Sequence, residues 1–356
     1  MNEDKLLSMA KIDGFLLFSS ENLRDVNFDY FSGFRKPTYS FFLASKKKML
    51  ITSSIDYDRA LNESNLNVIR FKDYDYKLKR ILRENFKGKK LGIIASSLPL
   101  SIVKTLRGYK LVDVSEIASE IRAVKNKKEI KLIKKACKIT NKGIKYFENN
   151  LSINLTEKQL AVLLEDYLKK KGAESLSFPT VLTSGKRSAL IHPYPECSNR
   201  KISKGLGLID FGVGYKGYCS DVTIPFIIGK LTDRQKKIVN AVKTAYENSI
   251  ETLKEGKCAH EVYEAAEKII NNNGFELKHS VGHGLGLEVH DFPSLSPKPK
   301  NKAEMKKWKP IKLKTGMVVT LEPGVYEQNE GGCRLENDIL IAKKPVVLTK
   351  SKFLEI

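Results

Sequence analysis

The sequence predicts an α+β protein of two domains, a small α/β domain followed by a larger domain built from two similar halves. The chain has 356 residues, which is more than a single hydrophobic core usually organises. Its first third alternates β-rich runs with helical ones, and the remainder repeats an order of two helices and a strand pair. We expect the domains to be 1–122 and 123–356.

Residues 1–122 are expected to form the α/β domain. Short β-rich runs alternate with helical candidates near 74–86 and 98–107. A lysine-rich stretch that opens a helix, at 122–135, marks the domain boundary. The expected strands are 14–19, 40–45, 49–53, 67–71, 90–95 and 110–114.

The larger domain shows the same order of elements twice. Capping boxes, in which a threonine is followed three residues later by a glutamine, open one expected helix at Thr156 and another at Thr232. Each half has a further helix, and each ends in a strand pair punctuated by glycines, at 205–229 and at 316–342. This repeat predicts two similar halves that face each other across a cleft.

The composition bears on partners and location. The formal charge of +22 would suit an anionic partner, but the lysines are scattered and interleaved with acidic residues, so we expect a solvated surface and no nucleic-acid partner. No run of about 18 apolar residues occurs and the N-terminus is charged, so we expect neither a membrane partner nor a signal peptide. Five cysteines without CxxC spacing fit reduced thiols in the cytoplasm.

Two aspartates stand out in the first strand pair. Asp210 and Asp221 are equidistant from the midpoint of Tyr215 and Lys216, so a regular hairpin would make them direct cross-strand partners. Like charges in that position destabilise a sheet, and an unpaired carboxylate is costly to bury in an apolar strand. A bound cation would remove both costs.

The second strand pair repeats this feature. Glu322 ends the apolar run 317–321, and Glu336 lies opposite it across a Gly-rich loop. Between the two strand pairs, His283 is flanked by glycines that allow close approach of a ligand, and three of the five histidines fall within 279–291. Four carboxylates and one imidazole form a hard, oxygen-rich set that suits two divalent ions and hydrolytic chemistry.

Four segments in this order resemble the pita-bread metallopeptidases, specifically their branch of Xaa-Pro dipeptidases (prolidases) and Xaa-Pro aminopeptidases. The segments are IDFGVGYKGYCSDVTIPF, HSVGHGLGLEVHD, TLEPGVY and CRLEND. The resemblance spans the whole chain, because YFSGF at 30–34 and SIDYDRA at 54–60 are similar to the accessory domain of that branch. It implies a creatinase/prolidase-like N-terminal accessory domain, a pseudo-twofold pita-bread catalytic domain and a homodimer.

The resemblance also implies the metal ligands. Asp210 would bind one ion, His283 and Glu322 would bind the other, and Asp221 and Glu336 would bridge the two. The ions would be Mn²⁺ or Co²⁺, with Fe²⁺ or Zn²⁺ as alternatives.

Four further residues are implied to act beside the metals. His192 and His290 would contact the scissile bond or the tetrahedral intermediate, and His279 would line the substrate pocket. Arg334 would orient Glu336 and steady the site. These roles, like those of the ligands, come from the resemblance.

An Xaa-Pro bond is a tertiary amide without an N–H, so peptidases that grip the scissile amide hydrogen handle it poorly. We hypothesise that a hydroxide bridging two metal ions attacks the carbonyl, Glu322 shuttles its proton toward the proline nitrogen, and His290 with a metal ion stabilises the oxyanion. The family usually has an acidic residue where this chain has Asn337, and we expect this change to tune the surroundings of the metals.

The predicted function is metal-dependent hydrolysis of Xaa-Pro dipeptides. The compact accessory domain and the short chain resemble those of the small microbial prolidases, and this resemblance implies a prolidase. One alternative is an Xaa-Pro aminopeptidase that releases the N-terminal residue from longer peptides. The other is a non-catalytic binding protein of this fold for RNA or another anionic partner, which is disfavoured because non-catalytic members lose ligands and this chain has all five.

Overall fold

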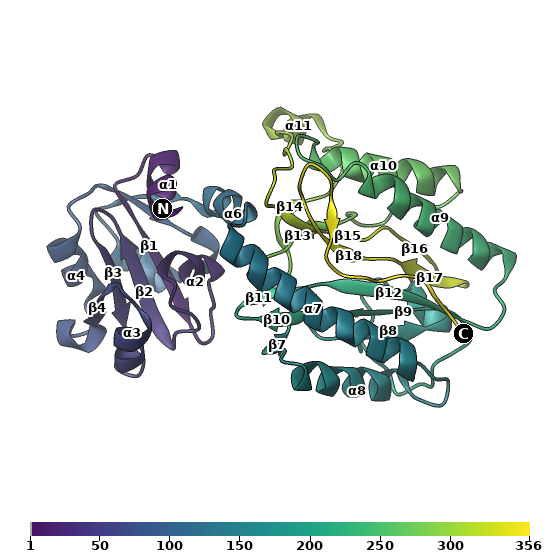
Figure 1. Cartoon of the computed structure of the whole chain (residues 1–356). Helices are drawn as coiled ribbons and strands as arrows, with labels where there is room; N and C mark the ends of the chain where they lie inside the picture. The colour runs from purple at the N-terminus through teal and green to yellow at the C-terminus, as the bar shows by residue number, and fades with distance from the viewer. Residues whose placement is uncertain (1) are drawn as a thin grey trace. The chain divides into compact units, whose positions relative to one another are not determined.

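The computed structural model describes residues 2–356, and the chain divides between Arg122 and Ala123 into two compact units (Figure 1). The N-terminal unit contains a mixed six-stranded sheet with the order β4-β3-β2-β1-β5-β6. All six strands lie within two residues of the predicted positions. They are β1 (Gly14–Ser20), β2 (Tyr39–Ala44), β3 (Lys48–Thr52), β4 (Asn67–Arg70), β5 (Lys90–Ile93) and β6 (Lys110–Asp113).

Helices cover both faces of this sheet. Successive side chains of a strand point to opposite faces, so each strand packs against the helices on both sides. On β1, Leu16 and Phe18 pack with α4 and α5, whereas Phe15 and Leu17 pack with α1, α2, α3 and α6. The latter four helices were not predicted, since seven to nine residues give too few turns to show a clear period. The helices are α1 (Asn2–Ala10), α2 (Val26–Ser32), α3 (Tyr57–Glu63), α4 (Leu78–Asn85), α5 (Leu100–Thr105) and α6 (Ser115–Ala123).

The first half of the C-terminal unit packs α7 (Lys127–Asn150) and α8 (Glu157–Lys170) against a four-stranded sheet with the order β20-β12-β9-β8. The predicted capping box is present, with the Thr156 hydroxyl accepting the Gln159 N–H at 3.1 Å. The strands of this sheet are β8 (Val181–Ser184), β9 (Gly205–Phe211), β12 (Val222–Ile228) and β20 (Leu354–Glu355).

The second half packs α9 (Asp233–Ile250) and α10 (Ala259–Asn272) against a five-stranded sheet with the order β14-β13-β15-β18-β19. Its capping box at Thr232 is also confirmed. Figure 1 shows the two helix pairs on opposite sides of this unit with the strands between them. Further elements of this half are β13 (His283–Gly284), β14 (Asp291–Ser294), α11 (Lys302–Lys307), β15 (Val318–Leu321), β18 (Asn337–Leu340) and β19 (Val346–Val347).

The first strand pair corrects one prediction, because Asp210 lies opposite Thr223 and not opposite Asp221. The turn is Lys216-Gly217, whose φ angles of 47° and 80° are those of a two-residue type I′ hairpin turn. The partner of Asp210 is thereby shifted by two residues, and a two-residue shift keeps both aspartates on one face. They are diagonal neighbours. This hairpin continues into β10 (Val213–Tyr215) and β11 (Tyr218–Cys219), and β10 also pairs with β7 (Ser175–Leu176).

The second strand pair has the predicted register. Glu322 and Glu336 lie between two antiparallel ladders that follow one another along the strands. One is the β15–β18 ladder, and the other is the hairpin of β16 (Gly324–Glu327) and β17 (Gly331–Arg334). Both ladders share a single register, which places Glu322 opposite Glu336.

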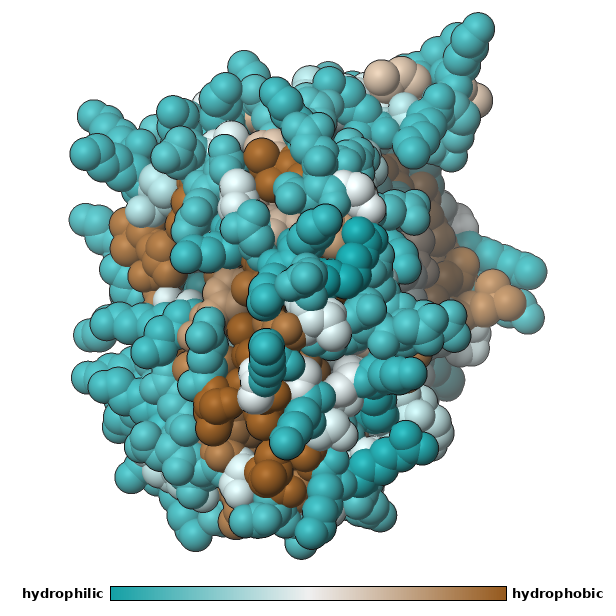
Figure 2. Space-filling model, turned by 90° about the vertical axis from the view of Figure 1, so that its right-hand side faces the viewer, coloured by the Kyte–Doolittle hydropathy of each residue, from teal (hydrophilic) through white to brown (hydrophobic). Residues whose placement is uncertain are grey.

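No helix among residues 2–356 combines the length and the apolar character needed to cross a membrane. Figure 2 shows a face of the molecule on which hydrophilic residues predominate and hydrophobic residues form smaller areas between them. Apolar atoms make up a large part of the surface of any folded protein, so limited hydrophobic areas of this kind are usual.

Candidate metal centre

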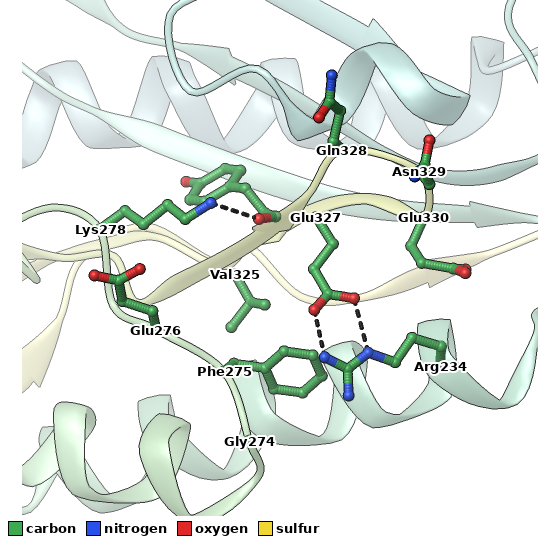
Figure 3. Close-up of a pocket in the computed structure, with 11 residues that line it drawn as sticks. Arg234, Gly274, Phe275, Glu276, Lys278, Val325, Glu327, Gln328, Asn329 and Glu330 are labelled. Carbon is green, nitrogen blue, oxygen red and sulfur yellow. Dashed lines mark hydrogen bonds and ion pairs between the residues drawn. The ribbon is translucent and has the colours of Figure 1, made fainter.

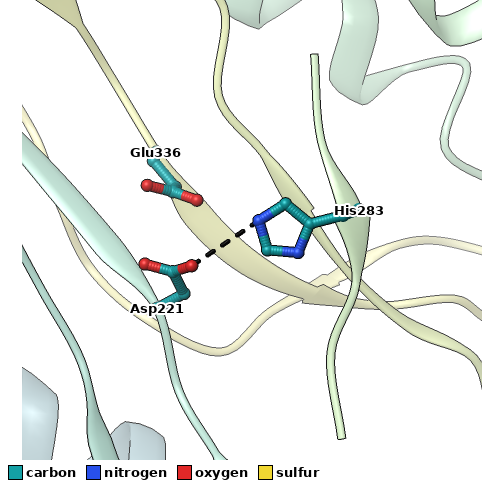
Figure 4. A group of neighbouring side chains, drawn as sticks. All are labelled: Asp221, His283 and Glu336. Carbon is teal, nitrogen blue, oxygen red and sulfur yellow. Dashed lines mark ion pairs between the residues drawn. The ribbon is translucent and has the colours of Figure 1, made fainter. Parts of the chain in front are cut away.

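Asp221, His283 and Glu336 bring their ligand atoms within 4.8 Å of one another (Figure 4). All three residues are buried. Asp221 directly precedes β12 in the first half of the unit, whereas His283 opens β13 and Glu336 directly precedes β18 in the second. Strands from both halves therefore bring two carboxylates and an imidazole to one point.

The separations between these groups fit a metal ion. His283 Nε2 lies 3.6 Å from Asp221 Oδ2 and 3.5 Å from Glu322 Oε1. Two ligands bound to one ion at about 2.1 Å in a tetrahedral arrangement are roughly 3.4 Å apart. In addition, Oδ1 of Asp210 and Oδ1 of Asp221 are buried without a hydrogen-bond partner. Buried oxygens of this kind are costly unless a cation or a donor satisfies them.

The electrostatics of the site also favour a bound cation. Burial, and then the neighbouring carboxylates, raise the pKa of Asp221 and that of Glu336 well above the ordinary range. Burial raises the pKa of Glu322 and lowers the pKa of His283. The imidazole is therefore neutral, as a metal ligand must be, while the carboxylates need a positive partner to ionise.

Arg334 connects the two halves of the site. Its Nη2 donates to Asp210 Oδ2 at 2.5 Å, and its Nε donates to Thr223 Oγ1 at 2.9 Å. The Thr223 hydroxyl in turn donates to Glu336 Oε2 at 2.6 Å. Arg334 thus reaches Glu336 through a threonine that was not predicted. Thr223 could have been predicted from the sequence, because it lies two residues after Asp221 and residues two apart on a strand share a face.

Tyr326 links Arg334 to His279 and was also not predicted. Its hydroxyl accepts from Arg334 Nη1 at 2.7 Å and lies 3.0 Å from His279 Nε2. His279 Nδ1 is 2.6 Å from the Ser280 carbonyl oxygen, which can only accept, so Nδ1 carries the proton and Tyr326 donates to Nε2. Burial lowers the pKa of His279. The ring is thus neutral, in one tautomer, with Nδ1 3.9 Å from Glu322 Oε2.

A cavity of about 570 Å³ opens onto this group, and all nine predicted site residues line it. The ring of His290 meets that of His283 edge to face, with the ring centres 4.4 Å apart. Burial lowers the pKa of His290 as well. His192 lines the cavity from the loop that follows β8. Apolar residues form another part of the lining, namely Phe178, Pro179, Val181 and Ile191.

Asp338 is a third residue that was not predicted. Its two carboxylate oxygens accept the backbone N–H of Asp221 at 3.2 and 3.1 Å, and burial raises the pKa of Asp338 to about 8. Asn337, which was expected to tune the surroundings of the metals, accepts the N–H of Ser351 at 2.7 Å and so holds the C-terminal segment. Alternation along a strand was the missed signal, because residues 336 and 338 share a face.

A second cavity, of about 670 Å³, contains none of the predicted site residues (Figure 3). In it, Arg234 forms an ion pair with Glu327 and lies over the Phe275 ring, 4.1 Å from its centre. Lys278 donates to the backbone carbonyl of Tyr326 at 3.1 Å. These contacts brace the β16–β17 hairpin and thereby hold Tyr326 in the site.

The comparisons with known families decide the classification. The profile of metallopeptidase family M24 matches residues 131–343, and that of the creatinase/prolidase N-terminal domain matches residues 4–124. The chain belongs to metallopeptidase family M24. All nine residues at the cavity lie within the M24 match, and membership makes this protein a metal-dependent peptidase.

Three proteins similar to this M24 chain have names that refer to Xaa-Pro substrates. An Xaa-Pro dipeptidase of Pyrococcus horikoshii is 35% identical over 310 residues, which are 85% of this chain and 83% of that protein. The structure of an X-Pro aminopeptidase from Thermotoga maritima aligns with a TM-score of 0.85 at 30% identity, covering 99% of this chain and 100% of that one. An Xaa-Pro dipeptidase from Bacillus anthracis aligns with a TM-score of 0.88 at 28% identity, covering 100% and 99%.

Proposed function

We propose that this M24 enzyme hydrolyses Xaa-Pro dipeptides with two divalent metal ions. The observation that carries the proposal is the convergence of four carboxylates and one imidazole at a single cavity, with two buried carboxylate oxygens that have no hydrogen-bond partner. Relatives that are 31% and 35% identical over most of the chain are Xaa-Pro dipeptidases, which supports this substrate class.

In this proposal the five ligands divide between two ions. Asp210 would hold one ion, His283 and Glu322 would hold the other, and Asp221 and Glu336 would contribute ligand atoms to both. The position of the His283 ring supports this division, because Nε2 is about equally far from Asp221 and Glu322. Mn²⁺ and Co²⁺ are the proposed ions, since both accept carboxylate and imidazole ligands.

The bound ions would polarise the scissile carbonyl and make hydroxide available at neutral pH. Glu322, whose pKa burial raises, is suited to take up a proton and pass it to the proline nitrogen. His290 is neutral and can donate a hydrogen bond to the carbonyl oxygen as negative charge develops there. His192, at the same cavity, offers a second contact to the substrate. None of these steps needs an N–H on the scissile bond.

One observation favours a second candidate, an Xaa-Pro aminopeptidase that acts on longer peptides. Among the described residues that line the cavity there is no lysine, and the one arginine, Arg334, is already bonded to Asp210. The carboxylate of a dipeptide would need a cationic partner there, whereas an internal proline would not. The similarity to the Thermotoga maritima aminopeptidase is in line with this alternative.

Hydrolysis of defined peptides separates the candidates. Metal-free protein would be loaded with Mn²⁺, Co²⁺, Fe²⁺ or Zn²⁺ in turn and assayed with Leu-Pro, Leu-Pro-Gly and Leu-Ala. We expect Leu-Pro to be cleaved fastest, with Mn²⁺ or Co²⁺ bound, and Leu-Ala to be a poor substrate. Preference for Leu-Pro-Gly would identify an aminopeptidase. Absence of hydrolysis with every ion and every peptide would contradict both and would favour a non-catalytic binding protein.

We also propose an accessory domain at 1–122, a catalytic domain at 123–356, a homodimeric assembly and a cytoplasmic location. The division of the chain between Arg122 and Ala123 supports the boundary. Analytical ultracentrifugation of the full chain tests the assembly, and cell fractionation tests the location. A monomer at micromolar concentration would contradict the proposed assembly.

A further inference from the structure

Lys125 and Asp291 form a buried ion pair beside the active-site cavity. Lys125 Nζ lies 3.9 Å from Asp291 Oδ2, and each side chain is only 1% exposed. Asp291 lines the cavity and directly follows His290 in the chain. A separation of 3.9 Å is too long for a hydrogen bond, so this contact acts through the attraction of opposite charges in a dry environment.

The pair lies against the backbone of the loop that carries His290. This loop joins β13 to β14, and its ends are held together where Gly284 pairs with Asp291. A Cβ atom at Gly286 would come within 2.7 Å of Asp291 Oδ2 and 3.2 Å of Lys125 Cε. The glycine therefore leaves just enough room for the ammonium and the carboxylate to meet under the loop.

Lys125 itself is held by the strand that leads to Glu322. Its backbone N–H donates to the Gly316 carbonyl at 3.0 Å, and Val124 forms a β-bridge with Met317, directly before β15. The ammonium is thus attached to one wall of the metal centre, whereas its carboxylate partner belongs to the loop of His290. Attraction between them draws the loop toward that wall.

We propose that Lys125 is a positioning residue for His290. Its ammonium holds the Asp291 carboxylate, and this keeps the adjacent His290 ring edge to face with His283 at the cavity. The inference deepens the proposed function, because it rests on the role given there to His290. Removing only the ammonium leaves a buried carboxylate without this partner, and the loop then moves to let water reach it.

Kinetics of the full-length, metal-loaded protein test the proposal. Lys125→Met keeps much of the side-chain volume and removes the charge. Lys128→Met is the matched control, at an exposed position three residues further on, in the first turn of α7. We expect Lys125→Met to lower kcat by between about tenfold and a hundredfold with little change in KM or in metal content, since small misplacements of reacting groups cost this much. Lys128→Met should match the wild type.

The double variant Lys125→Met/Asp291→Asn separates positioning from charge neutralisation. It removes both charges of the pair, so its unfolding midpoint should lie closer to that of the wild type than the midpoint of Lys125→Met does. The kcat should stay low, because the attraction between Lys125 and Asp291 is still absent. Recovery of wild-type kcat in the double variant, or an undiminished kcat in Lys125→Met, would overturn the proposal.

A readout that does not depend on activity is the NMR signal of the imidazole rings in the metal-free protein. The chain has five histidines, so the signal of His290 can be assigned with His290→Ala. We expect Lys125→Met to shift or broaden that signal and to leave the signal of His260, which packs on Trp308, unchanged. An unmoved His290 signal would refute the positioning role. Wild-type protein that cleaves no peptide would refute the proposed function instead and would leave this NMR test valid.

Discussion

Glu322 combines two properties that a proton carrier needs. It lies 3.5 Å from His283 Nε2, at the metal centre, and burial raises its pKa. A carboxyl whose pKa lies nearer to neutral pH both accepts and releases a proton more readily. The opposing Glu336 also has a ligand atom within 4.8 Å of His283, but it accepts a hydrogen bond from the Thr223 hydroxyl as well, so the two glutamates have different surroundings.

We expect Glu322→Gln to lower kcat by at least about a hundredfold, because the amide cannot carry the proton. Hydrolysis of Leu-Pro, with metal content measured on the same samples, provides the check. Glu247→Gln is the control, since Glu247 is exposed on helix α9 and does not line the metal cavity. Full turnover by Glu322→Gln with metals bound would rule out the proton-carrier role.

The raised pKa values predict how pH and metal act together on stability. In the metal-free protein, the folded state binds protons at Asp221, Glu322 and Glu336 more tightly than the unfolded chain does, whose carboxyl pKa values are about 4. The folded state therefore loses stability as pH rises above about 4 and through the raised pKa values. Bound divalent ions offset this loss because they pair with the ionised carboxylates.

The difference in Tm between metal-loaded and metal-free protein should consequently widen from about pH 5 to about pH 8. Thermal unfolding in saturating Mn²⁺ and in chelator, at several pH values, measures this difference. Glu336→Gln should reduce the widening, since one of the titrating carboxyls is gone. A difference that stays constant or narrows with rising pH would show that these carboxyls do not titrate as described.

The start of helix α8 organises the loop of His192. Glu157, which is 1% exposed, accepts the N–H of Ser184 at 2.8 Å and that of Ser198 at 3.1 Å. Arg187 Nη1 donates to the same carboxylate at 2.8 Å. The first residue of the helix thus joins the end of β8 to both ends of the loop at 185–198, which includes His192.

Glu157→Gln should lower the free energy of unfolding by about 3 kcal/mol. Arg187, whose side chain is 12% exposed, loses its ionic partner, and the donors that bond to the replaced carboxylate oxygen lose their acceptor. We also expect a higher KM, since His192 lies in the loop that these bonds hold. Denaturant unfolding and peptide kinetics provide the two measurements. Glu165→Gln on the same helix, which is partly exposed, is the control and should stay within about 0.5 kcal/mol of the wild type. Equal effects of the two substitutions would contradict this account.

The two units of the molecule have separate hydrophobic cores, and only one of them contains the metal centre. The only tryptophan of the chain, Trp308, lies in that unit. Its fluorescence therefore reports on the catalytic unit, whereas circular dichroism reports on both. Ligand binding stabilises only the part of a protein that the ligand holds together.

Removal of metal should lower the Trp308-monitored unfolding temperature by about 5 to 10 °C, given a metal concentration of about a hundred times Kd. A second transition, visible in circular dichroism and belonging to the N-terminal unit, should not move. Readdition of Mn²⁺ is the control and should restore the first transition. A single transition that shifts as a whole would show that the two units unfold together.

Local patterns in the sequence were sufficient for the domain order, the six N-terminal strands, the capped helices and the set of metal-ligand candidates. Each depends on near neighbours in the chain, such as apolar alternation, a threonine three residues before a glutamine, or a carboxylate in an apolar strand. The short helices α1, α2, α3 and α6 were missed because their packing on the sheet, rather than their own periodicity, stabilises them.

Contacts between distant segments were decided only by the tertiary structure. The Lys216-Gly217 turn set the pairing of Asp210, and the link from Arg334 to Glu336 runs through Thr223. The same holds for Asp338 at Asp221 and for the burial that shifts the carboxyl pKa values. The residue types that bind metal could be recognised in the sequence, but their distances and charges depend on how the two halves pack together, which no local pattern encodes.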